Sequence, residues 1–273
     1  MKFDYDQAWR DTTRLLSGNL GLLAVIAGIF FFVPYAALMI ALPEMASFAQ
    51  PDPTAGSEAM MAAMTDFYAQ YWWVLLLLAV VQAIGMLAML ALLRRQANPT
   101  VGEALGSGFR AVLSYFAAQL LLAAALMLAI MLLLAPAIAT GSTGLAVIGG
   151  IAAMVLFLYV LIKFSLAAPV IAIEGTLDPI AALRRSWTLT KGNSVRLFFF
   201  YLLLVVAFLV ASAVVSMILS LIFALFGEGA ALFGTAVSTS LINAVFIVLM
   251  VAVLAAVHGQ LARISARAAP TET

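Results

Sequence analysis

AVLSYFAAQLLLAAALMLAIMLLLA, residues 111–135, contains no charged side chain from end to end. An apolar run of about 20 residues is long enough to cross the roughly 30 Å hydrocarbon core of a membrane as a helix. Within lipid, the backbone groups of a lone segment must bond to one another, which favours a helix. This stretch therefore predicts a membrane-spanning helix rather than part of a soluble core.

Five further runs of the same kind predict five more spans. The expected spans are about 20–42, 72–93, 111–135, 145–168, 196–226 and 236–258. The chain is 66% hydrophobic and 9% charged, whereas roughly a quarter of the residues in soluble domains are charged. We expect an all-α, polytopic membrane protein that forms one membrane domain over residues 1–273.

Basic residues lie on only one side of this six-span layout. That side holds every lysine and arginine of the chain: Lys2, Arg10, Arg14, Arg94, Arg95, Arg110, Lys163, Arg184, Arg185, Lys191, Arg196, Arg263 and Arg267. The opposite side carries acidic residues alone: Glu44, Asp52, Glu58, Asp66 and Glu228. Because basic loops stay in the cytoplasm, both termini and a tail over 259–273 are expected there, in a bacterial inner (cytoplasmic) membrane.

A short basic amphipathic helix is predicted over residues 178–192, just before the fifth span. Asp178-Pro179 is typical of a helix N-terminus, and Gly192 of a C-terminus. Such a helix is expected to lie at the membrane surface. Its cations, with those of an N-terminal helix over 1–19, are candidate ligands of anionic lipid headgroups: Arg184, Arg185, Lys191, Arg10 and Arg14.

The N-terminal segment repeats the pattern of residues 178–192 at a constant offset of 174. Asp4, Ala8, Arg10, Leu15, Gly18 and Asn19 match Asp178, Ala182, Arg184, Leu189, Gly192 and Asn193. A weaker third copy begins near Pro99, where Ala104-Leu105 is laid on Ala182-Leu183. Six spans with three surface helices then suggest three units, each a surface helix followed by two spans. Chance similarity between amphipathic helices is the competing explanation.

The composition excludes several kinds of chemistry. There is no cysteine, and His258 is the one histidine, so thiol catalysis, Fe–S clusters and multi-histidine metal sites are excluded. We expect no catalytic residue, no cofactor and no metal ion, and a net charge of +1 gives no indication of nucleic acid. No carboxylate lies in the middle of a span, which lowers the case for ion-coupled transport.

Two ionisable side chains are expected near the cytoplasmic ends of the spans. Lys163 either extends to the headgroups or pairs with Glu174, eleven residues further on. His258 is interpreted as an interfacial polar residue rather than a proton relay, because no acidic residue is near it in the sequence.

Polar stripes run along the fifth and sixth spans at helical spacing. They are Ser212, Ser216 and Ser220 on one span, and Thr235, Thr239 and Asn243 on the other. Small and hydroxylated stripes usually mediate close helix packing. The alternative, functional interpretation is that the two stripes form a polar path for a ligand.

Residues 168–175, APVIAIEG, are followed at fixed distances by Pro179, Ala182-Leu183, Arg185-Ser186-Trp187 and Lys191-Gly192-Asn193. This pattern resembles the membrane domain of the glycerophosphoryl diester phosphodiesterase family. The resemblance implies a multi-span domain that either precedes a catalytic barrel or stands alone. The family's catalytic barrel uses histidines, carboxylates and a metal, which this chain does not supply. We therefore expect the membrane domain without the activity.

The first hypothesis is a non-catalytic scaffold or lipid-handling module, with anionic membrane lipids as partners. The second is a small-molecule or lipid transporter or channel that uses the two polar stripes, and the third is an intramembrane enzyme. A second copy of the chain or another membrane protein stays open as a partner.

Overall fold

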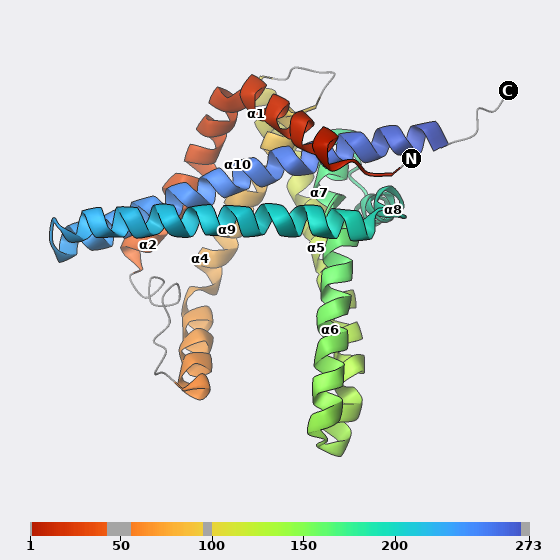
Figure 1. The fold of residues 1–273 in the computed structure, drawn as a ribbon, viewed down its shortest axis with the longest axis horizontal. Coiled ribbons are helices and arrows are strands. Elements are labelled where there is room, and N and C mark those ends of the chain that lie inside the picture. Colours follow the sequence, from red (N-terminus) through yellow and green to blue (C-terminus); the bar gives the residue numbers. More distant parts are fainter. Residues whose placement is uncertain (1, 43–55, 95–99, 269–273) are drawn as a thin grey trace.

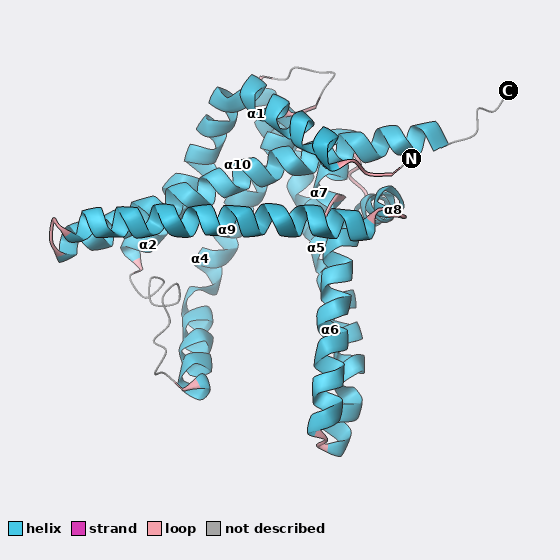
Figure 2. Ribbon diagram, in the orientation of Figure 1, coloured by secondary structure: helices cyan, strands magenta, loops and turns pink. Residues whose placement is uncertain are grey.

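The computed structural model describes residues 2–42, 56–94 and 100–268. In chain order the elements are α1 (Tyr5–Ala27), π-helix η1 (Gly28–Phe32), α2 (Val33–Ala41), α4 (Ser57–Leu92), α5 (Val101–Thr140), α6 (Thr143–Phe164), α7 (Ala167–Pro169), π-helix η2 (Val170–Glu174), α8 (Pro179–Thr190), α9 (Ser194–Ala224) and α10 (Glu228–Ala268). Figure 2 shows this part of the chain as helices joined by turns, with no strand.

Six helical stretches are long and apolar enough to cross a membrane, which confirms the predicted six-span, all-α architecture. They are Tyr5–Ala41, Glu58–Leu92, Val101–Thr140, Thr143–Glu174, Ser194–Ala224 and Gly229–Arg267. At 1.5 Å per residue, the 40 residues of α5 extend about 60 Å. That is about twice the thickness of a hydrocarbon core, so such helices tilt or continue into the interface.

The predicted N-terminal surface helix and first span form one continuous path. Helix α1 runs without a break from Tyr5 to Ala27 and is followed directly by η1 and α2. A helix irregularity is expected near Pro34, because proline lacks a backbone N–H and its ring crowds the preceding turn. The π-helix at Gly28–Phe32 lies just before this proline, so the structure places the irregularity where it is expected.

Two boundaries near the C-terminal side of helices differ from the prediction. The third span was predicted to end at residue 135, but α5 continues through Pro136 to Thr140 and is followed by Gly141, whose φ is 64°. Helix α10 continues to Ala268, so most of the predicted tail is helical, and residues 269–273 lie outside the described residues.

The core lies where α1, α4 and α10 meet, and two hairpins extend from it. We compare how much of the most apolar segment of each span is buried inside the protein. The buried share is 39% in the α1–α2 stretch, 39% in α4 and 44% in α10. The corresponding shares are 6% in α5, 11% in α6 and 6% in α9. Figure 1 shows the α5–α6 and α9–α10 hairpins leaving the hub in different directions. Their exposed apolar surfaces are far larger than a soluble monomer shows and are suited to lipid.

The described residues reveal three related units. Helices α1, α5 and α8 each begin after a residue whose side chain accepts a hydrogen bond from the first turn. These caps are Asp4, Thr100 and Asp178, at offsets of 96 and 78 residues. The second offset equals the 78 residues that separate Ala104 from Ala182 in the sequence, so the caps place the middle copy in register with the third.

Small residues on these three helices lie at the same positions in each unit. Four residues after the cap comes an alanine of 0% exposure: Ala8, Ala104 and Ala182. Four residues later comes a second buried small residue: Thr12, Gly108 and Ser186. Each surface helix packs on the long helix that ends the preceding unit: α1 on α10, α5 on α4, and α8 on α6. The contacts therefore close the three units into a ring.

We predict that Gly108→Ala destabilises the protein. A Cβ at Gly108 would lie 2.8 Å from the Ile84 carbonyl oxygen and 2.9 Å from the Ala88 nitrogen, so α4 and α5 would have to separate. Such overpacking typically costs about 1–3 kcal/mol. The measurement is the thermal unfolding temperature in detergent micelles, followed by tryptophan fluorescence.

Gly106→Ala is the matched control, because a Cβ there meets nothing within 4 Å. Replacing a helical glycine by alanine favours the helix by up to about 1 kcal/mol. An unfolding temperature for G108A equal to or above that of G106A would contradict the close approach.

Candidate functional site

Helix α8 is placed across the C-terminal end of α6 by local capping and by two hydroxyl groups. The Asp178 carboxylate accepts hydrogen bonds from the backbone N–H groups of Ile180 and Ala181. The Ser186 and Thr190 hydroxyls both donate to the Lys163 carbonyl oxygen, at 2.9 and 3.3 Å. Because the last carbonyls of a helix lack intrahelical donors, these bonds satisfy the end of α6 and fix α8 on it.

A groove of about 590 Å³ lies between α5, α6 and α8. Helices α5 and α6 give it apolar walls, including Leu121, Ala125, Leu156 and Phe164. Helix α8 contributes Ile180, Leu183 and Trp187, together with the polar groups of Arg184 and Thr188. We call this the α8 groove. Its volume falls within the range of about 300–1,000 Å³ that is typical of small-molecule sites.

Lys163 lies beside the α8 groove and stacks on aromatic rings. Its ammonium nitrogen is 4.8 Å from the centroid of the Trp187 ring and 5.6 Å from that of Tyr159. The side chain is 4% exposed. Of the two alternatives given for Lys163, pairing with Glu174 does not occur among the described contacts, because the electron-rich faces of the rings take the cation instead.

Glu174 is bonded to Arg185 and His258. The Arg185 Nε lies 3.1 and 3.2 Å from the two carboxylate oxygens, and the His258 Nε2 lies 2.9 Å from one of them. Arg94 donates to the nearby Ala172 carbonyl oxygen at 2.9 Å. This cluster connects α4, η2, α8 and α10. Arg185 is thereby committed to a protein contact rather than presented to a headgroup.

The sequence did not predict that Glu174 is the acidic partner of His258, because the two residues are 84 positions apart. The one signal available was that Glu174 follows an apolar run at the membrane face, where a carboxylate requires a partner. The structure shows that α10 brings His258 to it.

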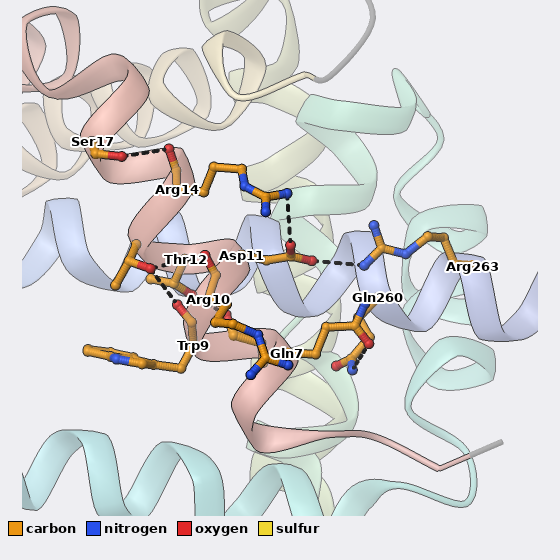
Figure 3. A network of polar contacts seen from close by, with 11 residues as sticks. Gln7, Trp9, Arg10, Asp11, Thr12, Arg14, Ser17, Gln260 and Arg263 are labelled. Atoms are coloured by element: carbon orange, nitrogen blue, oxygen red, sulfur yellow. Dashed lines mark hydrogen bonds and ion pairs between the residues drawn. The ribbon is translucent and has the colours of Figure 1, made fainter.

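A second polar cluster docks the N-terminus on α10 (Figure 3). The Asp11 carboxylate accepts from the Arg263 guanidinium at 2.8 Å and lies 4.0 Å from that of Arg14. The Gln260 amide donates to the Asp4 carbonyl oxygen and to Gln7. Asp11 is 6% exposed, so this contact is a structural anchor.

The candidate ligands of lipid headgroups therefore fall into two groups: exposed cations and cations that contact a carboxylate of the protein. Arg184 is exposed on α8, Lys191 is exposed directly after its last residue, and Arg10 is exposed on α1. Arg185 is bonded to Glu174, and Arg14 is near Asp11. Among the described residues, Arg184 is the cation that lines the α8 groove.

The two polar stripes do not form a shared path in the described structure. Ser212, Ser220 and Thr235 donate to carbonyl oxygens of their own helices. Ser216 and Ser220 are exposed on α9, while Thr239 and Asn243 are half-buried on α10. Hydroxyl groups that bond back to their own helix need no partner across the hairpin.

Comparison with protein families supports the resemblance found in the sequence. Residues 136–265 match the family model described as the membrane domain of glycerophosphoryl diester phosphodiesterase. The comparisons with curated proteins and with solved structures give no match. The matched segment contains the motif at 168–193, all of α6, α8 and α9, and most of α10. Residues 136–265 are therefore similar to the membrane domain of glycerophosphoryl diester phosphodiesterase.

Proposed function

We propose that this chain is a non-catalytic lipid-binding module of a bacterial inner (cytoplasmic) membrane. The observation that carries the proposal is the α8 groove, which combines apolar walls from two spans with the basic residue Arg184. A phospholipid has the same division, with acyl chains at one end and a phosphate at the other. An anionic phospholipid is the ligand whose chemistry this groove fits.

The acyl chain and the headgroup of a lipid contribute differently to the free energy of binding at such a site. Each methylene that moves from water into an apolar site is worth about 0.8 kcal/mol, but a lipid chain in the bilayer is already away from water. Selection among lipids must therefore come from the headgroup, where each nearby cation contributes about 1 kcal/mol. The cations available for this selection are Arg184, exposed on α8, and Lys191, exposed at the C-cap of α8.

A transporter or channel based on the polar stripes is less well supported. Ser216 and Ser220 are exposed on the outside of α9, and the hydroxyls of Ser212, Ser220 and Thr235 are already bonded within their own helices. A conducting or substrate path requires polar groups that face a common interior.

We predict that replacing both Arg184 and Lys191 by glutamine weakens the preference for anionic lipid by up to about 30-fold. Each lost cation removes about 1 kcal/mol, and 1.4 kcal/mol corresponds to a factor of ten. The measurement is native mass spectrometry of the purified chain with a phosphatidylglycerol and phosphatidylcholine mixture, in which the ratio of the two bound lipids is counted.

Arg185→Gln is the matched control, because it removes one cation from the same helix but one that is held by Glu174. It should lower thermal stability while leaving the lipid ratio close to that of the wild type. An unchanged ratio in the double variant, or an equal change in R185Q, would rule out selection of headgroups by the exposed cations.

Topology is a separate expectation that a fusion experiment tests. Because loops rich in lysine and arginine remain in the cytoplasm, green fluorescent protein fused after Thr273 should fluoresce. Alkaline phosphatase inserted within residues 43–55 should be active, since this enzyme folds only outside the cytoplasm. A dark C-terminal fusion with an inactive phosphatase insertion would reverse the proposed orientation.

A further inference from the structure

A second apolar groove, of about 440 Å³, lies between α1, α9 and α10. Helix α9 supplies apolar wall residues such as Phe200, Leu203 and Ala207. Helix α1 supplies Tyr5, Asp6 and Trp9. We call this the α1 groove. Its position, between a surface helix and the hairpin before it in the ring of units, is the same as that of the α8 groove.

Seven lining positions correspond between the two grooves. Helix α5 lines the α8 groove with positions 121, 122, 125, 126 and 129, and α9 lines the α1 groove with positions 199, 200, 203, 204 and 207. Every pair is separated by 78, the offset between the caps Thr100 and Asp178. The surface helices agree as well, because Asp6 and Trp9 correspond to Ile180 and Leu183 at the offset of 174. The two grooves thus share one wall and part of the surface helix at repeat-related positions.

The charge at the two grooves is opposite. The charged residue that lines the α8 groove is Arg184, whereas the one that lines the α1 groove is Asp6. The position that corresponds to Arg184 is Arg10, which is exposed but does not line the α1 groove. A groove that presents a carboxylate at the membrane surface disfavours an anionic headgroup and favours one that carries a cation.

Aromatic rings strengthen this preference. Tyr5 stacks on Phe200 with ring centroids 5.9 Å apart and an interplanar angle of 4°, which fixes its orientation. Trp9 replaces the Leu183 of the other groove and is 48% exposed. Tyrosine and tryptophan faces attract ammonium groups, and Tyr5 and Trp9 line the α1 groove together with Asp6.

We propose that the α1 groove is a second lipid site, which binds a zwitterionic phospholipid whose headgroup ends in a primary ammonium. The acyl chain lies along α9, and the ammonium donates a hydrogen bond to the Asp6 carboxylate beside Tyr5 and Trp9. The proposal rests on the function proposed above, in that the α8 groove is its anionic counterpart. The chain would thus hold two kinds of lipid at repeat-related sites.

The test uses two groove-filling variants at corresponding positions of the purified full-length chain. Ala125→Trp fills the α8 groove and Leu203→Trp fills the α1 groove; both positions are exposed, so thermal stability should stay close to that of the wild type. Native mass spectrometry with phosphatidylethanolamine and phosphatidylglycerol in equal amounts reports the bound lipids. L203W should lose the phosphatidylethanolamine adduct and A125W the phosphatidylglycerol adduct.

Asp6→Asn tests the carboxylate without changing the shape of the groove. It should lower the ratio of bound phosphatidylethanolamine to bound phosphatidylglycerol by about fivefold, which corresponds to about 1 kcal/mol. Asp66→Asn removes an exposed carboxylate on α4 and should leave this ratio unchanged. Trimethylation of the headgroup, in phosphatidylcholine, should weaken binding to the wild type, because it removes the N–H donors while keeping the charge.

The outcomes separate the two proposals. If A125W changes nothing while L203W and D6N act as expected, the anionic site fails and the ammonium site stands. If L203W leaves the phosphatidylethanolamine adduct in place, or if D6N leaves the lipid ratio unchanged, the ammonium site is overturned whatever A125W does. Loss of the same lipid in both tryptophan variants would also overturn it.

Discussion

The close approach of each surface helix to the last helix of the preceding unit is the constraint on which the rest of the structure depends. Such approach requires small side chains at the crossing, because a larger one would hold the backbones apart. The three units satisfy this with Ala8 and Thr12, Ala104 and Gly108, and Ala182 and Ser186. Gly108 is the extreme case, since backbone atoms of α4 occupy the space that a Cβ would need.

These crossings also determine where ligands can bind. A helix held flat across the base of a hairpin leaves a recess between itself and the hairpin. The α8 and α1 grooves are recesses of this kind. The hydroxyls of Ser186 and Thr190 satisfy the Lys163 carbonyl oxygen, so α8 is fixed by the same contacts that complete α6. Packing and site formation therefore depend on one set of residues.

The spans and the repeat were predictable because both leave local signals in the sequence. Uncharged runs such as 111–135 predict helices directly, and the offset of 174 between Asp4 and Asp178 predicts two equivalent surface helices. The contacts between units leave no such signal. The bond between Glu174 and His258 joins residues 84 apart, and the stacking of Lys163 on Trp187 depends on the path of α8 over α6. The grooves could not be predicted either, because each combines helices from two units.

The middle unit shows how the repeat limits the number of sites. On its surface helix, Gly102 and Gly106 occupy the positions of Ile180 and Arg184 in the third unit, and of Asp6 and Arg10 in the first. Neither glycine offers a side chain that could form a groove wall or supply a charge. The facing helix also differs, because Phe30, at the position of Leu126 and Leu204, packs tightly against Gly85 of α4.

The middle copy is thus used for packing in the buried hub, whereas the other two copies keep their recesses open toward lipid. Because the middle unit supplies the packing of the hub, the residues that line the grooves beside the other two surface helices are free to differ. Arg184 in one recess and Asp6 in the other are the difference that this freedom permits.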